Sequence, residues 1–142
     1  MELDLLKIRP YQQEDRGGLL SLWGEVFGAS AGHNNPETSL DKKLRHDPDL
    51  LLVAVMDSLV VGSVMGGYDG HRGWIYSLAV TPTLRRKGIA SALMHEIEVL
   101  LRERGCLKVN LQVVSSNSEV VALYEELGFH VEERISMGKK LY

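Results

Sequence analysis

A short cationic turn, Arg85-Arg86-Lys87-Gly88, is the segment of this chain whose residue types and order best suit ligand chemistry. It follows an apolar run at 74–80 and precedes an amphipathic run at 89–104, so the order is strand, basic turn, helix. The start of a helix presents backbone N–H groups without partners and a partial positive charge, which together attract phosphate. Gly88 has no side chain to keep a ligand away from the backbone. We therefore expect an anion site here, with a pyrophosphate as its ligand.

Other phosphate and metal sites are disfavoured by the residue order. A nucleoside-triphosphate loop requires Gly-x-x-x-x-Gly-Lys-Ser/Thr, whereas Lys87 precedes its glycine and no Ser or Thr follows it to hold magnesium. The dinucleotide fingerprint Gly-x-Gly-x-x-Gly is missing after Val80. Carboxylates and histidines show no metal-ligand spacing. We therefore expect the anion to bind without a metal.

The composition indicates one ordinary globular domain at 1–142, because the chain has 142 residues, 44 % of them hydrophobic and 25 % charged. A net charge of −3 argues against a nucleic-acid or membrane partner. Cys106 is the single cysteine, so no internal disulfide can form, and a reducing compartment is expected. The acidic N-terminus does not resemble a signal peptide, and no apolar stretch approaches the roughly 20 residues of a membrane span. A cytoplasmic location is therefore expected.

The hydrophobic pattern predicts a mixed α/β (α+β) layer fold without repeats or linkers. Strands are expected at 3–9, 50–56, 59–68, 74–80, 107–114, 129–133 and 135–142. Helices are expected at 13–27, from Thr38 to Pro48, at 89–104, and at 116–127, the last opened by a Ser116–Glu119 capping box. Gly62, Gly66 and Gly67 either weaken the strand at 59–68 or mark a bulge in it.

Two motifs in this order resemble those of the GNAT superfamily of N-acetyltransferases. The segment Leu78-Ala79-Val80-x-Pro82-x-x-Arg85-x-x-Gly88-x-Ala90 resembles its acetyl-CoA signature. The segment Asn117-x-x-x-x-Ala122-Leu123-Tyr124-x-x-Leu127-Gly128-Phe129 resembles its second signature. The opening Ile8-Arg9-Pro10 is also typical, the element order matches over essentially the whole chain, and the run at 66–73 looks like an uncharacterised bacterial subgroup. The resemblance implies a mixed, mostly antiparallel sheet whose fourth and fifth strands splay apart, flanked by the four predicted helices.

The resemblance also implies how acetyl-CoA, the co-substrate, would be held. Its pantetheine arm would fill the gap between the splayed strands and pair with the backbone of Leu78 and Val80. Its pyrophosphate would lie on backbone N–H groups of residues 86–90, with added charge from the cationic side chains. The cofactor-binding residues carried over are Leu78, Ala79, Val80, Arg85, Arg86, Lys87, Gly88, Ile89, Ala90 and Asn117.

Tyr124 matches the tyrosine that protonates the departing CoA thiolate in this superfamily. A phenol with an ordinary pKa near 10 is neutral at pH 7 and able to donate a proton. Its spacing from Val120 and Leu127 puts it on the apolar stripe of a helix, where a tyrosine is more often part of a core. Ser116 and Asn117 have a plainer interpretation as helix caps.

The sequence departs from the family pattern at the general base. Relatives that acetylate protein N-termini carry a glutamate where this chain has Gln112, and an amide cannot take a proton from an ammonium group. Glu25, Asp69, or a water chain held by Tyr76 and Ser77 remain as candidates. We expect direct attack on the thioester, with a backbone N–H near Leu78 or Val80 facing the oxyanion and Cys106 not acting as a nucleophile.

The acceptor is not disclosed by the sequence. Its wall is expected from the first two helices, the loop at 28–36, and the turns at 69–73 and 134–136. The polar residues of that wall are His33, Asn34, Asn35, Asp69, His71, Arg72 and Arg134. This mixture has no single charge, so a small amine, an amino acid or a peptide N-terminus all fit, and other acyl donors and a homodimer stay open. A non-catalytic acyl-CoA sensor is the main rival, and a nucleic-acid module is disfavoured by the net charge.

Overall fold

The computed structural model describes residues 5–28 and 35–142 in two compact units, Met1–Leu111 and Gln112–Tyr142, which are taken separately below. His33 and Asn34, expected in the acceptor wall, and the start of the first predicted strand lie outside the described residues. Asn35 is described, and its side-chain oxygen accepts a hydrogen bond from the Thr38 N–H at 3.2 Å.

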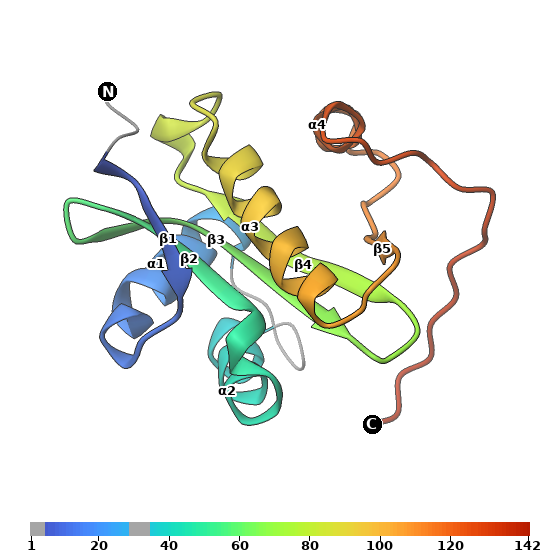
Figure 1. The fold of residues 1–142 in the computed structure, drawn as a ribbon, viewed down its shortest axis with the longest axis horizontal. Coiled ribbons are helices and arrows are strands. Elements are labelled where there is room, and N and C mark those ends of the chain that lie inside the picture. Colours follow the sequence, from blue (N-terminus) through green and yellow to red (C-terminus); the bar gives the residue numbers. More distant parts are fainter. Residues whose placement is uncertain (1–4, 29–34) are drawn as a thin grey trace. The chain divides into compact units, whose positions relative to one another are not determined.

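The first unit is built on a five-stranded mixed sheet with the order β1-β2-β3-β4-β5 (Figure 1). The strands are β1 (Lys7–Pro10), β2 (Leu51–Met56), β3 (Leu59–Tyr68), β4 (Gly73–Val80) and β5 (Val109–Asn110). Neighbouring strands pair antiparallel from β1 to β4, whereas β4 and β5 pair in parallel. A parallel pair needs a crossover, which the chain between β4 and β5 supplies with a helix. This confirms the predicted mixed, mostly antiparallel sheet.

Four α-helices accompany the strands in the described residues. They are α1 (Arg16–Phe27), α2 (Pro36–His46) and α3 (Ile89–Glu103) in the first unit, and α4 (Ser118–Glu126) in the second. Three short 3₁₀ turns at Gln13–Asp15, Pro48–Leu50 and Pro82–Leu84 precede α1, β2 and the cationic turn. In Figure 1, α3 crosses in front of β3 and β4, and α1 lies behind the sheet.

Two glycines of β3 explain how α3 lies so close to the sheet. A Cβ at Gly62 would come within 3.0 Å of Leu93, and one at Gly66 would come within 2.9 Å of Ile97. Ile89 also lies 3.1 Å from the Gly62 position, and Ile89, Leu93 and Ile97 share one face of α3, so this face packs along the two strand glycines. The strand glycines are therefore packing positions for the helix that begins at the cationic turn.

The opposite face of the sheet packs against α1. Leu19, Leu22 and Trp23 of α1 form one buried cluster with Met65 of β3 and Ala79 of β4. Within it, the Trp23 Nε1–H donates to Ser63 Oγ at 2.8 Å, and both side chains are buried. A buried indole N–H needs such an acceptor, so this bond fixes α1 against β3.

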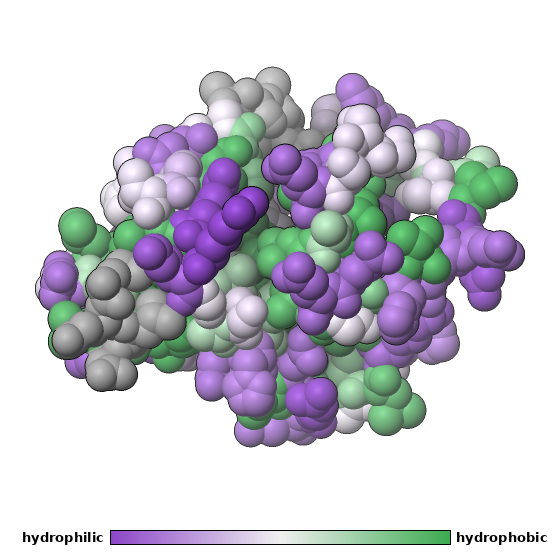
Figure 2. Space-filling model, turned by 90° about the horizontal axis from the view of Figure 1, so that it is seen from above, coloured by the Kyte–Doolittle hydropathy of each residue, from purple (hydrophilic) through white to green (hydrophobic). Residues whose placement is uncertain are grey.

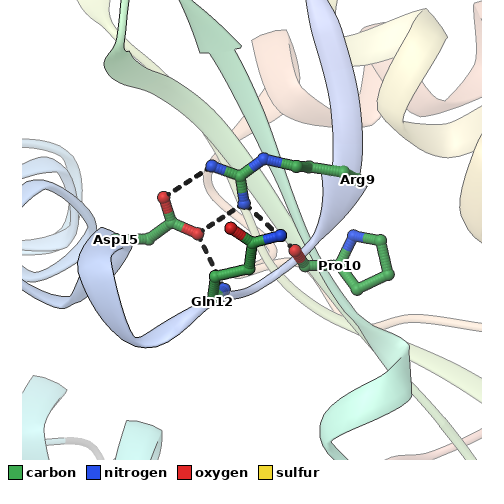
Figure 3. A network of polar contacts seen from close by, with 4 residues as sticks. All are labelled: Arg9, Pro10, Gln12 and Asp15. Atoms are coloured by element: carbon green, nitrogen blue, oxygen red, sulfur yellow. Dashed lines mark hydrogen bonds and ion pairs between the residues drawn. The ribbon is translucent and has the colours of Figure 1, made fainter.

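The joint between β1 and α1 is held by a buried carboxylate. Arg9 donates two hydrogen bonds to Asp15, at 2.7 and 2.9 Å, and the Gln12 backbone N–H donates a third at 2.8 Å. Figure 3 shows the guanidinium facing the carboxylate, with a further bond to the Pro10 carbonyl. Burial raises the pKa of Asp15, but the bonds from Arg9 and Gln12 outweigh it and hold the pKa below its usual value.

Several sequence-based boundaries were wrong. The first strand includes Pro10, which is acceptable on a sheet edge. α2 begins at Pro36 with Asn35 as its cap, rather than near Thr38. α4 is capped by Asn117, which confirms the cap interpretation of that residue, and not by Ser116. The expected strand at 107–114 shortens to Val109–Asn110, and residues 129–142 form no strand. Alternating apolar residues make a segment suitable for pairing, but a strand also needs a partner in register.

Candidate functional site

A bulge interrupts β4 beside the candidate site. Ser63 and Met65 of β3 lie on one face of the sheet, yet their partners in β4, Ala79 and Tyr76, are three residues apart. One extra residue is therefore inserted in β4, and Ser77 adopts a left-handed backbone with φ of 53°. Nothing in the alternation of 74–80 signals this feature. A bulge bends a strand and turns its next backbone groups, which here belong to Leu78.

The far part of β4 has a free edge. β5 pairs only with Gly73 and Trp74, so within the described residues of the first unit no strand pairs with this edge beyond Trp74. The Thr81 N–H donates to the Val61 carbonyl of β3 at 2.8 Å. Because backbone groups alternate along a strand, those of Val80 and Leu78 point away from β3, toward the free edge. This is the splay that the resemblance implied.

The cationic turn follows directly. Arg86 has a left-handed backbone with φ of 63°, and Gly88, the N-cap of α3, has φ of 86°. Left-handed residues in a turn are typical of loops that bind anions through successive backbone N–H groups. The first backbone N–H of this segment with a helical hydrogen bond is that of Ala92, which donates to the Gly88 carbonyl at 3.0 Å. Within the described chain, the backbone N–H groups of residues 86–91 have no backbone acceptor. They form a row of backbone donors at the start of α3.

The predicted cofactor residues divide into backbone and side-chain groups. Ala79 and Ile89 are each 1 % exposed, so their side chains belong to the core and only their backbone is available to a ligand. Arg85, Arg86 and Lys87 are exposed, and no salt bridge holds them among the described residues. The structure thus brings together nine of the ten predicted residues, from Leu78 to Ala90, in one strand–turn–helix segment of the first unit.

Asn117, the tenth, belongs to the second unit. Its side-chain oxygen accepts a hydrogen bond from the Val120 N–H at 3.4 Å, so it caps α4. Its amide nitrogen is then the group able to contact another molecule.

Tyr124 is held at the other end of α4. The side chain is half-buried, and burial raises the pKa of Tyr124 to about 12. The Phe129 N–H donates to the Tyr124 carbonyl at 3.0 Å, and the Gly128 N–H donates to the Glu125 carbonyl at 3.1 Å. The rings of Tyr124 and Phe129 meet edge to face, with centroids 5.6 Å apart and planes at 73°. The phenol therefore stays protonated at neutral pH on a fixed helix end.

The candidate general bases differ in their exposure and in their hydrogen-bond partners. Glu25 is exposed on α1. Asp69 accepts backbone hydrogen bonds from Arg72 at 2.7 Å and His71 at 2.8 Å, which lower its pKa and commit it to its turn. Burial, with a smaller contribution from Asp69, raises the pKa of Tyr76, so this phenol is neutral at pH 7. The lowered pKa of Asp69 is the opposite of the raised carboxylate pKa that would mark a base.

Gln112 is engaged within the second unit. Its side-chain nitrogen donates a hydrogen bond to Ser136 Oγ. This bond ties the residue that stands in place of a glutamate to the turn at 134–136, where the acceptor wall was expected. The sequence did not signal it, because the two residues lie in segments separated by α4.

The surface seen in Figure 2 is mixed in character. Hydrophilic and apolar side chains are interspersed on the face that Figure 2 shows, which is usual for a protein surface. No described helix is both long enough and apolar enough to cross a membrane.

Comparison with known proteins gives consistent matches. The family model described as the acetyltransferase (GNAT) family matches residues 18–129. An acetyltransferase of Pectobacterium atrosepticum is 44 % identical over 96 % of both chains. One of Yersinia pseudotuberculosis is 43 % identical over the same shares. The crystal structure of Ard1 from Thermoplasma volcanium has a TM-score of 0.78 at 27 % identity, covering 90 % of this chain and 84 % of its own. Aminoglycoside N-acetyltransferase AAC(6')-Iy, solved with CoA, has a TM-score of 0.78 at 18 % identity, covering 96 % and 95 %.

Proposed function

Because the chain belongs to the acetyltransferase (GNAT) family, we propose that it moves the acetyl group of acetyl-CoA directly to a primary amine. The observation that carries this proposal is the continuous segment from the free edge of β4 through the cationic turn to the start of α3. It offers strand-edge backbone groups for the pantetheine arm, then exposed cations at 85–87 for outer phosphate, and, overlapping them, a row of backbone N–H donors at 86–91 for the pyrophosphate. The family match crosses both units, which supports treating 1–142 as one domain.

The backbone is the main binding element in this proposal. Leu78 and Val80 hold the pantetheine arm as an added strand would be held. The N–H groups of residues 86–90 hold the pyrophosphate, helped by the positive end of the α3 dipole. Arg85, Arg86 and Lys87 contribute exposed charge, and the Asn117 amide nitrogen contacts the pantetheine arm. The solved complex of AAC(6')-Iy with CoA supports the choice of ligand.

Acetyl-CoA supplies the acetyl group as a thioester, and the chain assists its transfer. The neutral amine forms a C–N bond to the acetyl carbon while the C–S bond breaks and its electron pair stays on sulfur. A backbone N–H of Leu78 or Val80 stabilises the oxyanion. The Tyr124 hydroxyl donates its proton to the sulfur, and water returns a proton to the phenolate. The amine loses its own proton to water, since the described candidate bases are neutral, exposed or committed elsewhere.

The acceptor proposed is a small amine, an amino acid or a peptide N-terminus. A structural neighbour, AAC(6')-Iy, was solved in complex with the bisubstrate analogue CoA-S-monomethyl-acetylneamine, which supports an amine acceptor in this proposal. The engaged side chain of Gln112 favours a positioning role for that residue over a base role.

A panel of amines with purified protein and acetyl-CoA tests the proposal. Release of free CoA thiol that depends on the amine, together with an acetylated product of matching mass, supports it. Acetyl-CoA binding by calorimetry without thiol release for any amine would instead favour the second candidate, a non-catalytic acyl-CoA sensor. That candidate is motivated by Gln112, which cannot remove a proton. Absence of CoA binding would contradict both.

A further inference from the structure

The end of α4 has a geometry that the acid role of Tyr124 leaves unexplained. The bonds from Phe129 to Tyr124 and from Gly128 to Glu125 form the six-to-one and five-to-two pair of a Schellman motif. Gly128 supplies the left-handed residue that this motif needs, with φ of 95°. Schellman motifs are commonly completed by an apolar contact between the first and the last residue of the motif, which here are Tyr124 and Phe129.

This contact involves the ring that carries the phenol. Phe129 meets Tyr124 edge to face at 5.6 Å, an arrangement favoured by aromatic quadrupoles. The Phe129 backbone is at the same time bonded to the Tyr124 carbonyl. The two contacts fix both the backbone and the ring of Tyr124, so rotation of the side chain about Cα–Cβ would break the ring contact. The ring contact that completes this helix end therefore also limits the positions that the Tyr124 hydroxyl can take.

We propose that Phe129 is a positioning residue that holds the Tyr124 hydroxyl in its proton-donating orientation. The inference rests on the proposed function, because it requires Tyr124 to be the acid. Phe129 itself does not touch the reacting atoms in this proposal. Its contribution is to reduce the number of unproductive Tyr124 rotamers, in which the hydroxyl cannot transfer its proton.

A double-mutant cycle on kcat tests the inference. Phe129→Leu keeps an apolar side chain and the backbone bond but removes the aromatic edge contact. With acetyl-CoA and the amine that releases most thiol in the panel, we expect Phe129→Leu to lower kcat about fivefold to tenfold, with KM for acetyl-CoA within twofold. In the Tyr124→Phe background the same change should alter kcat by less than about twofold, because no hydroxyl remains to be positioned.

Three outcomes overturn the inference. One is a kcat of Phe129→Leu equal to that of the wild type. Another is an equal loss of kcat in both backgrounds, which would mean that Phe129 acts by packing alone. The third is a normal kcat for Tyr124→Phe, which would contradict the acid role itself and so is distinguishable from the first two. Leu123→Ala is the matched control, since it removes a half-buried apolar side chain one residue away and should lower Tm without the kcat loss.

A second measurement needs no turnover. With 3-fluorotyrosine in place of tyrosine, the fluorine line that is missing in Tyr124→Phe identifies residue 124. We expect this line to shift when CoA is added to the wild-type protein, and we expect Phe129→Leu to reduce that shift while CoA affinity is unchanged. The same shift in both proteins would overturn the inference.

Discussion

The two ends of helices that carry the proposed chemistry use a left-handed glycine in opposite ways. At the start of α3, Gly88 turns the chain so that the following backbone N–H groups are left without acceptors. At the end of α4, Gly128 turns the chain so that the carbonyls of Tyr124 and Glu125 receive hydrogen bonds. The first end keeps backbone donors without acceptors in the described chain, whereas the carbonyls at the second end have their donors.

This difference indicates what each end can do. Backbone donors that lack partners gain most from a ligand, so the start of α3 is suited to binding. A helix end whose groups are satisfied is rigid, so the end of α4 is suited to holding one side chain in place. Substitutions at the two ends should therefore separate affinity from turnover.

The largest effect is expected at Gly88. Gly88→Val places a β-branched residue at a left-handed position and adds side-chain atoms where the ligand approaches, so CoA affinity should fall more than about hundredfold. Gly128→Val strains the other end in the same way but should leave CoA affinity within about threefold while lowering kcat and Tm. Calorimetry with CoA in the presence of a chelator measures the CoA affinity of both variants. Equal losses of affinity would show that the two ends do not differ as described.

Tyr124→Phe should lower kcat about tenfold to hundredfold and leave acetyl-CoA affinity nearly unchanged, because only the hydroxyl is lost. The ring contact with Phe129 can persist, so Tm should change little. Steady-state kinetics and a melting curve on the same variant decide the matter. A lower Tm with normal turnover would assign Tyr124 to packing.

The pH profile gives a related test. Because burial raises the pKa of Tyr124 to about 12, the proton-donating form is fully present below that pH and is lost only as pH rises through it. No fall in kcat from this residue is therefore expected between pH 7 and pH 10. A decrease in that range which disappears in Tyr124→Phe would contradict the raised pKa.

The Arg9–Asp15 pair lies in neither helix end and serves as a reference. Asp15→Asn should lower the free energy of unfolding by about 1–3 kcal/mol, because the buried acceptor loses its ion pair with Arg9. CoA affinity should not change. The folded-state pKa of Asp15 is lowered, so its stabilisation is present above the ordinary carboxyl pKa and is lost as pH falls through the folded value. Urea unfolding at neutral and acidic pH measures this. The difference between wild type and variant should shrink in acid.

The smallest effects are expected at the exposed cations. Arg86→Ala and Lys87→Ala should each weaken CoA about fivefold or less, because exposed charges contribute little. Dephospho-CoA should be affected less than CoA, since these side chains reach outer phosphate while the backbone holds the pyrophosphate. Equal losses for both ligands would contradict this division between side chain and backbone.

The sequence predicted the strand, turn and helix around the cationic residues well because their signals are local. A basic turn between a strand and an amphipathic helix is legible from residue order, and most strands of the first unit were found within one or two residues. The bulge at Ser77 was missed because it depends on the register of β4 against β3. The Gln112–Ser136 contact was missed for a similar reason, since it joins residues on either side of α4.

The glycines of β3 and the last residues of the chain also show where patterns within one segment fail to predict contacts. The expectation of a bulge is confirmed beside Gly62, where β3 has one extra residue in its pairing with β2. The sequence interpretation did not consider that Leu93 and Ile97 need the space at Gly62 and Gly66. The strands expected at 129–133 and 135–142 were inferred from alternation alone, and the described residues there form none. Patterns within one segment predict an element, but contacts between segments decide its role.

Amide NMR at the start of α3 tests the central claim most directly. Nitrogen-15 spectra recorded during titration with CoA should show the largest shifts at the amides of residues 86–90, and pantetheine, which has no phosphate, should leave these amides nearly unmoved. Both ligands should perturb the amides of Leu78 and Val80. Saturating CoA that shifts amides elsewhere while residues 86–90 stay in place would contradict the proposal that this helix start holds the pyrophosphate.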